Sequence, residues 1–491
     1  VRDARAGAVV TLEGVTREVE ALDYEAYVEM ARSKLAAIGA EEAERHGLCA
    51  VALVHRVGRV PLSEPSVIVA ASAGDATVVS FLAATLLMLL VAACIGQFTR
   101  RMAAPGGLYT LTAKGLPPGA AFACAVGLVV GYGLLAGGAL AGAGQYLAEF
   151  AAMLGLRLGG PGTAAVVVVV AAGAAVLVRR GVRLSARVVL LVESAAIGLM
   201  VAVFALLLVN GPAPGPPADV PPPTVGGIAA GVVPAIAAFI GFEVATVLGA
   251  EARRPFRSVP RAVGATAALA GVLYLFAAQT QVFGFATTPG GLAAQQDPVL
   301  TLAVARGWVW VPLVLDVALV ASFLACALAS LTALSRVLFS LAKDGVAPAA
   351  LGRAHPRHHT PHVALVAIVP VVVVLAGAVA AGVPIGHLLV VLITMATCGF
   401  LVSYVLVCAA APLFLRRIGE LTAGAVGAAA VTAPVLLVAL VAFVVVSPLP
   451  SALLGALAVL GLAWYGWVRW ARPAELAGIG VYDETLSTDV L

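Results

Sequence analysis

IAAFIGFEVATVLGAEARRPFRSVPRA, residues 236–262, is the stretch that decides how the rest of the chain is interpreted. A hydrophobic run carries Gly241 in its middle and a carboxylate, Glu243, two residues later. A charged acid in the middle of a bilayer costs about 2.5–3.5 kcal/mol, so it is tolerated where it faces a cavity or a partner. A nearby glycine permits a broken helix whose freed backbone groups line such a cavity. The pattern predicts the binding centre of a membrane transporter.

Apolar side chains dominate the chain of 491 residues. Hydrophobic residues make up 62% of it and charged residues 11%, whereas about a quarter of the residues of a soluble domain are charged. This composition predicts a polytopic helical membrane protein over most of the length. The net charge of +4 says little by itself, because the placement of Lys and Arg matters more than their sum in such proteins. Nothing in the composition supports a nucleic-acid partner.

The cysteines and histidines show no pattern of a metal site. No CxxC pair occurs, and five of the six cysteines lie in or beside apolar runs, so we interpret them as small apolar residues without a disulfide framework. Four histidines gather between positions 355 and 362, without helical metal-ligand spacing and without Cys or acidic neighbours. We expect a loop there rather than a metal site. The sequence therefore predicts neither a metal nor a cofactor.

The first 75 residues differ from the rest because charge is concentrated in them. Strand-like runs occur at 7–14, 49–60 and 65–73, and an amphipathic helix is expected within 21–47. The order β–α–β–β describes a small α+β unit. It is short for an independent hydrophobic core.

Several motifs of this unit occur in the order known from one enzyme family. They are Glu13-Gly14, Arg17, the YEAY block at 24–27, the HRVG block at 55–58 and Pro65-Ser66. Residues 5–73 resemble the large, catalytic subunit of molybdopterin synthase, which transfers sulfur from a small partner's thiocarboxylate to a pterin precursor. The resemblance implies that Arg17, His55 and Arg56 contact the pterin phosphate or its pocket. It also implies a molybdopterin synthase small subunit as a partner of this segment.

The unit departs from that family at positions that carry its chemistry. Gly74-Asp75 stand where the family has a further basic pair, and the chain's lysines, at 34, 114 and 343, lie in no context that matches the catalytic lysines. The segment between Arg17 and Leu22 is also short. We therefore favour a catalytically inactive fragment over a working sulfur-transfer domain on a membrane anchor.

Long apolar runs begin at Ala76. A helix needs about 20 apolar residues to cross the ~30 Å of a hydrocarbon core. Eleven runs qualify, near 77–98, 119–152, 163–178, 187–209, 226–250, 262–285, 309–338, 362–382, 386–412, 424–446 and 451–470. The sequence thus predicts a mostly all-α polytopic body over residues 76–475, followed by a cytoplasmic tail over 476–491.

Lys and Arg are distributed unevenly between the loops. They follow every odd-numbered run, whereas the loops at 210–227 and 287–298 contain none. The positive-inside rule places the basic loops and the C-terminus in the cytoplasm, so the lipid bilayer expected here is the cytoplasmic membrane. The first run then starts outside. This conflicts with the N-terminal unit, which has a charged start and no secretory signal.

Three motif blocks of the body occur in the order and spacing of one transporter family. They are F-x-G-F-E at 239–243 with Glu251 and the P-R-A of 260–262, TRRM and APGGLY within 99–109, and SR, AKDG, HP and TP within 335–361. Residues 76–475 resemble the permeases of the amino acid–polyamine–organocation superfamily. The resemblance implies transport of amino acids or related organic cations, coupled to protons or to exchange.

The resemblance also implies a fold and reveals a gap in it. The family has twelve helices, ten of which form two inverted repeats of five. The first run here matches the family's second helix, and the first helix, which carries the Gly-rich segment for the substrate carboxylate, has no counterpart. We therefore expect a LeuT-like inverted-repeat body with about eleven spans. The missing helix would explain the conflict over orientation. Besides a permease and a synthase domain on a membrane anchor, it keeps open a third hypothesis, that the chain is a non-functional fusion.

The residues and the resemblance together define a candidate substrate site. Free carbonyls near Phe239 and Ile240 are expected to hold a substrate ammonium, with Phe239 or Phe242 as a gate. Gly241 marks the break, although a glycine that merely packs helices is the alternative. Glu243 is a candidate for proton coupling, because a carboxylate is costly to keep charged in apolar surroundings.

Other polar residues in the runs rank lower. Tyr132 and Gln145 are expected either to line the cavity or simply to pack. Glu251 is expected to pair with the arginines at the cytoplasmic end. Glu193 and Asp316 are further acids inside the membrane, and we rank both below Glu243.

Overall fold

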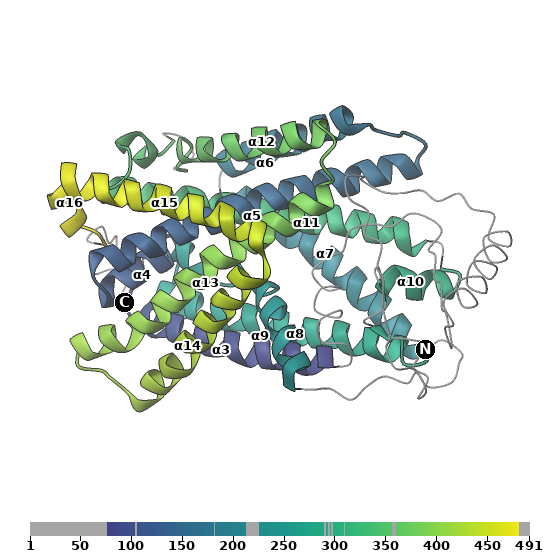
Figure 1. Ribbon diagram of the computed structural model, residues 1–491, viewed down its shortest axis with the longest axis horizontal. Coiled ribbons are helices and arrows are strands. Elements are labelled where there is room, and N and C mark those ends of the chain that lie inside the picture. Colours follow the sequence, from purple (N-terminus) through teal and green to yellow (C-terminus); the bar gives the residue numbers. More distant parts are fainter. Residues whose placement is uncertain are drawn as a thin grey trace, which may run out of the picture. The chain divides into compact units, whose positions relative to one another are not determined.

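The computed structural model describes residues 76–480 of the chain, with gaps at 104–105, 181, 213–224, 289–290, 293–294, 296–297, 309 and 356–359. The predicted α+β unit, its candidate residues Arg17, His55 and Arg56, and the tail beyond Gly480 lie outside the described residues. Within the described part, all regular secondary structure is helical, as Figure 1 shows.

Eight helices of the described part are long and apolar enough to cross a membrane. They are α3 (Thr77–Thr99), α5 (Pro118–Met153), α6 (Gly160–Arg180), α9 (Pro255–Gly284), α11 (Val311–Lys343), α13 (Ile385–Arg417), α14 (Ala423–Val446) and α15 (Pro448–Ala471). The prediction of an all-helical polytopic body is confirmed. The inverted-repeat arrangement stays a prediction.

The three other predicted runs contain shorter apolar helical stretches. They correspond to α7 (Val182–Val209), to α8 (Val225–Ala237) with the 3-10 helix η2 (Val244–Glu251), and to η5 (Ala364–Ile368) with α12 (Val369–Ala380). Short helices outside these runs are α4 (Leu108–Gly115), α10 (Pro298–Ala305), η4 (Ala349–Gly352) and α16 (Pro473–Ala477). Each predicted run is therefore helical, but two of them are broken into pieces.

One boundary differs clearly from its prediction. The run expected from residue 262 belongs to α9, which begins at Pro255. Its first two turns contain Arg257 and Arg261, both exposed, so a search for apolar residues misses them. Proline suits the first turn of a helix, where its missing N–H would have no partner anyway. The helix thus extends beyond its apolar part into a basic end.

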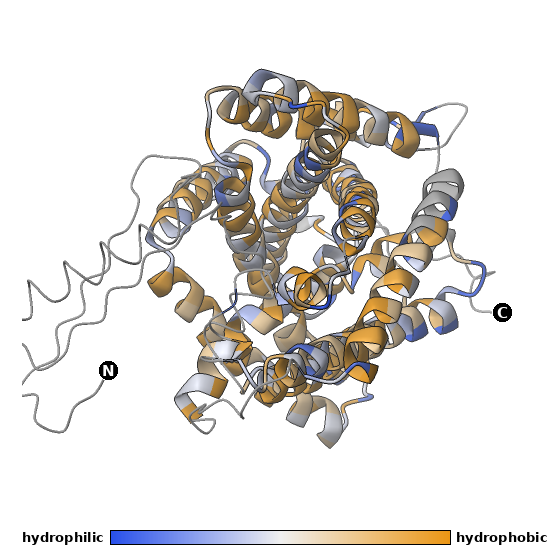
Figure 2. Cartoon of the chain, turned by 90° about the vertical axis from the view of Figure 1, so that its right-hand side faces the viewer, coloured by the Kyte–Doolittle hydropathy of each residue, from blue (hydrophilic) through white to orange (hydrophobic). Residues whose placement is uncertain are grey.

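The helix α5 forms the centre of the packing, with α11 and α13 against it, and α6 packs with α12 (Figure 1). The contact with α13 is close because two glycines face each other. A Cβ on Gly399 would lie 2.5 Å from the carbonyl oxygen of Gly127. Small residues let membrane helices approach in this way. The helices α14 and α15 instead expose apolar side chains, such as Val438 and Leu462. Apolar residues, coloured orange, make up most of the helices in Figure 2.

The charge pattern of the loops has two exceptions. Arg157 follows α5 and Arg306 precedes α11, at ends that the positive-inside rule would leave free of basic residues. Arg306 is held by the ends of neighbouring helices: its Nη1 donates to the Leu302 carbonyl at 3.0 Å, and its Nη2 donates to the Gly211 carbonyl. Carbonyls at helix ends carry partial negative charge, which stabilises a cation there.

Candidate functional site

The helix in which the opening stretch begins, α8, is interrupted shortly after the start of that stretch. The helix α8 ends at Ala237 and η2 begins at Val244, and the residues between them form turns. Gly241 lies in this break with a φ of 98°, a backbone conformation that residues with a Cβ rarely adopt. The predicted break is therefore present, and the glycine allows it.

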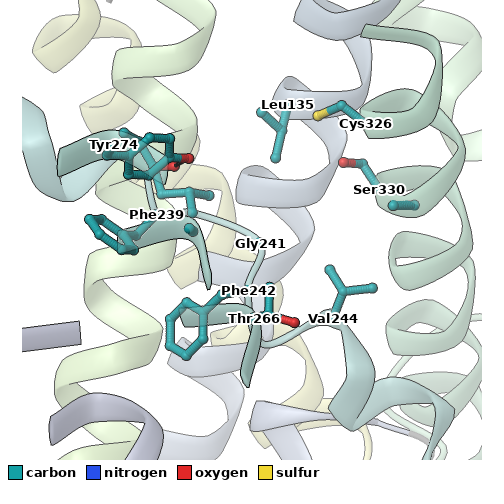
Figure 3. A pocket seen from close by; sticks show the side chains of 13 residues that line it. Leu135, Phe239, Gly241, Phe242, Val244, Thr266, Tyr274, Cys326 and Ser330 are labelled. Atoms are coloured by element: carbon teal, nitrogen blue, oxygen red, sulfur yellow. Dashed lines mark hydrogen bonds between the residues drawn. The ribbon is translucent and has the colours of Figure 1, made fainter. Parts of the chain in front are cut away.

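A cavity of about 250 Å³ lies against the break. Side chains from α5, α9 and α11 complete its wall. The lining residues are Leu135, Ala238, Phe239, Ile240, Gly241, Phe242, Val244, Thr266, Ala270, Tyr274, Cys326, Ala329 and Ser330. Figure 3 shows Phe239 and Tyr274 on one side and Cys326 and Ser330 on the other. The wall is mostly apolar with a few hydroxyl groups, as is typical of sites for small molecules.

Tyr274 connects the broken segment to α9. Its hydroxyl donates a hydrogen bond to the carbonyl oxygen of Ala238 at 2.5 Å. The Phe239 ring meets the Tyr274 ring edge to face, with centroids 5.0 Å apart. One of the carbonyls freed by the break is thus already satisfied by protein. Within the described part of the chain, the carbonyl of Phe239 accepts one long bond, 3.3 Å, from the N–H of Phe242.

Glu243 lies next to the cavity but not in its lining. The carboxylate is fully buried and accepts two hydrogen bonds from tyrosines of different helices. Tyr132 of α5 donates to Oε1 at 2.7 Å, and Tyr404 of α13 donates to Oε2. A buried carboxylate needs such partners. Glu243 therefore ties the end of the break to two central helices.

The six predicted substrate-binding residues fall into two groups. Phe239, Ile240, Gly241 and Phe242 line the cavity. Glu243 and Tyr132 are paired with each other beside it. The structure thus brings all six residues to the same break. Four of them form part of the cavity wall, and the other two hold the end of the break in place.

The lower-ranked residues are spread over the body. The Gln145 amide donates to Oε1 of Glu149 at 2.9 Å, and Gln145 is absent from the cavity wall. Glu193 accepts a hydrogen bond from Ser322 at 3.1 Å. Asp316 is buried on α11. The side chain of Glu251 lies outside the described side chains.

Sequence reasoning did not assign several residues of this region to the site. Tyr274, Cys326, Ser330 and Tyr404 all line the cavity or hold Glu243. Cys326 and Ser330 are four residues apart on α11, a spacing that puts two side chains on one helix face. A tyrosine within an apolar run also points to a buried hydrogen bond. Both patterns are visible in the sequence. The sequence does not show which helix packs against these side chains.

The structure gives no metal site among the described residues, since no group of three metal-ligating side chains occurs there. Of the clustered histidines, His355 and His362 lie in the described part, with ring centroids 5.2 Å apart. His358 and His359 lie outside it. The described residues of the wall and the Glu243 pair supply carbonyls, aromatic rings, hydroxyls, the Cys326 thiol and one buried carboxylate.

Two protein families match the chain. A family described as amino acid permease matches residues 62–460, and one described as MoaE protein matches residues 1–86. The body is similar to the branched-chain amino acid permease BcaP of Bacillus subtilis, 27% identical over 315 residues that cover 60% of this chain and 66% of that protein. It is also similar to cationic amino acid transporter 4 of Mus musculus, 30% identical over 142 residues, or 28% of this chain and 21% of that protein.

The N-terminal part has relatives of a different kind. It is similar to the molybdopterin synthase catalytic subunit of Oryza sativa subsp. indica, 52% identical over 79 residues, which cover 15% of this chain and 41% of that protein. The chain thus spans just under two thirds of the bacterial permease and less than half of the synthase subunit. Both resemblances inferred from the motifs are confirmed. The chain belongs to the amino acid permease family, as a multi-pass membrane protein with a MoaE-like segment before the permease body.

Proposed function

We propose that the chain is a secondary active transporter of amino acids or related organic cations. The observation that carries this proposal is the cavity at the break between α8 and η2. A broken helix with a cavity at its break is the arrangement by which transporters expose backbone carbonyls to a cationic group. A volume of about 250 Å³ suits a single amino acid rather than a peptide, because sites for larger ligands span about 300–1,000 Å³.

The wall supports a definite orientation of the substrate. The substrate ammonium lies at the carbonyls of the break, near Phe239 and Ile240. The Phe239 and Phe242 rings cover it from the side, where aromatic faces attract cations. The apolar residues of α5 and α9 contact the substrate side chain. Family membership supports an amino acid as the substrate.

Proton coupling or exchange drives the transport in this proposal. Glu243 is the candidate proton carrier, because it is the buried carboxylate attached to the break. The basic loops and the C-terminus lie in the cytoplasm, and the membrane is the cytoplasmic one. In this proposal the permease body transports its substrate with the arginine-rich loops on the cytoplasmic side of the membrane.

A second function is favoured by one observation, the 52% identity of the N-terminal part to a molybdopterin synthase catalytic subunit. In that alternative, residues 1–75 transfer sulfur in molybdenum cofactor biosynthesis, with a synthase small subunit as partner and Arg17, His55 and Arg56 at the pterin. The test is the purified chain mixed with a thiocarboxylated small subunit and the pterin precursor. Formation of molybdopterin that is lost in His55→Ala supports the alternative.

Uptake into proteoliposomes tests the transport proposal. Vesicles containing the purified chain receive labelled leucine or lysine, with and without an inward proton gradient and with unlabelled amino acid inside for exchange. Uptake above that of empty vesicles supports transport, and uptake equal to theirs contradicts it.

Sequencing the transcript across the codons for residues 60–90 tests the third hypothesis, that the chain is a non-functional fusion. A message that encodes an additional helix would rule out the fusion as given.

A further inference from the structure

Glu193 is a carboxylate inside the apolar body that lies outside both the cavity lining and the Glu243 pair. It sits on α7 and is half-buried. Ser322 of α11 donates to its Oε1 at 3.1 Å. Its other oxygen, Oε2, is buried and has no hydrogen-bond partner within the described part of the chain. Such an atom is costly unless something positive approaches it.

The carboxylate lies behind one end of the cavity wall rather than in the wall itself. The helix α7 packs against both α9 and α11, the helices that supply Tyr274 and Cys326 to the wall. Ser322, which holds Glu193, lies one turn before Cys326 on α11. In Figure 3, Tyr274 and Cys326 lie at the same end of the cavity, with Phe242 and Val244 at the other.

We propose that Glu193 is the residue by which this cavity selects substrates with a positively charged side chain. The inference rests on the proposed transport of amino acids and adds the class of substrate. The two relatives of the body point to different classes, since one is named for branched-chain and the other for cationic amino acids. An acid behind one end of the cavity wall favours lysine, arginine and related diamines over leucine.

The rest of the wall is consistent with this selection. A lysine or arginine side chain has an apolar stem and a charged tip. The stem contacts apolar lining residues such as Leu135 and Ala270, and the tip reaches the end formed by Tyr274 and Cys326. The α-ammonium group stays at the break. Ser322 keeps one carboxylate oxygen in place behind this end of the wall, and the charge of the carboxylate attracts the substrate's tip from there.

The test compares Glu193→Gln with the unaltered chain in proteoliposomes. The readouts are the KM values for labelled lysine and for labelled leucine, measured with the same vesicles. We expect the KM for lysine to rise about tenfold, because the attraction between the carboxylate and the charged tip of the substrate is lost. We expect the KM for leucine to change less than about twofold. Glu193→Asp, which keeps the charge, should restore part of the preference for lysine.

The matched control is Glu149→Gln on α5. It removes the same kind of side chain, which is bonded to Gln145 and is absent from the cavity wall. We expect both KM values to stay unchanged. Thermal denaturation of each purified variant with added arginine or leucine gives a second readout. Arginine should raise the melting temperature of the unaltered chain and not that of Glu193→Gln.

Three outcomes would overturn the inference. Equal losses for lysine and leucine in Glu193→Gln would make Glu193 a structural residue. Loss of the proton-gradient effect with an unchanged preference between lysine and leucine would make it a proton carrier. Leucine uptake without any lysine uptake or arginine stabilisation in the unaltered chain would reject the substrate class while leaving the transport proposal intact. Absence of uptake for both amino acids would instead contradict the transport proposal itself.

Discussion

Gly241 and Glu243 are two residues apart, yet they contribute to the break in different ways. Gly241 supplies a backbone conformation, with a φ of 98°, and no atom lies within 4 Å of the Cβ that it lacks. Glu243 supplies a fixed point, since two tyrosines hold its carboxylate. The first contribution belongs to the backbone and the second to tertiary contacts. Each can therefore be removed without the other.

Gly241→Ala tests the backbone contribution. The cavity has room for a methyl group there, so the cost comes from the positive φ, at about 1–3 kcal/mol. We expect a lower melting temperature and weaker uptake. Gly264→Ala on α9 is the control, because Gly264 is helical and also has open space around it. Alanine there should be neutral or stabilising. Equal losses in both variants would contradict the role given to φ.

Tyr132→Phe and Tyr404→Phe test the tertiary contribution. Each change leaves a buried carboxylate with one donor fewer, at a cost of about 1–3 kcal/mol. Because both tyrosines share Glu243, the double variant should deviate from the sum of the single ones. Melting temperatures of the purified proteins measure this. Tyr465→Phe is the control, since the Tyr465 ring packs on Phe122. Additive losses would mean that the two hydrogen bonds are independent.

At the level of helices, the sequence predicted the type of element better than its ends. Apolar length identified the eight long helices of the described part, because a helix that crosses a membrane needs about 20 apolar residues. The start of α9 at Pro255 escaped this criterion, since that end of the helix is basic. The break between α8 and η2 was predictable because Gly241 and an acid share one short stretch. Tyr404 and Tyr274 were not, since their role depends on which helices pack against the break, and a single sequence does not give that packing.

The segment after α15 forms a second set of contacts that apolar runs do not predict. It returns to the turn that follows α11. The Gly480 N–H donates to Oδ2 of Asp344 at 3.1 Å, and Tyr109 of α4 donates to the same oxygen at 2.6 Å. Burial and then the charge of Asp344 raise the pKa of Tyr109, so the phenol keeps its proton and donates. Asp344 thereby joins three elements.

Two truncations measure how much this segment contributes. Deletion of residues 473–491 removes the Gly480 contact and the burial of Ile479. A buried isoleucine contributes about 1.5–3 kcal/mol and a hydrogen bond about 1 kcal/mol. The melting temperature should therefore fall. Deletion of residues 482–491 is the control, because it keeps both contacts. An equal fall in both truncations would show that the contacts at Asp344 contribute little.

At the level of the whole molecule, the arrangement of charge predicts the orientation of the helices in the membrane. Every second loop is basic, with Arg157 and Arg306 as the exceptions. The expected orientation follows from the excess of Lys and Arg in the loops on one side of the membrane rather than from any single residue. Arg306 illustrates this, because its charge is held by helix-end carbonyls. The two exceptions therefore do not change the expected orientation, in which the turn between α13 and α14 lies in the cytoplasm.

Two matched leucines test that orientation. Leu156, between α5 and α6, and Leu421, between α13 and α14, are both exposed and belong to opposite sides of the membrane in the proposed topology. In a chain with Cys49→Ser, a membrane-impermeant maleimide applied to intact cells should label Leu156→Cys and not Leu421→Cys. Opening the cells should expose Leu421→Cys. The described native cysteines are buried or half-buried and should give little background. Labelling of Leu421→Cys in intact cells would reverse the topology, and the basic loops would then face outward.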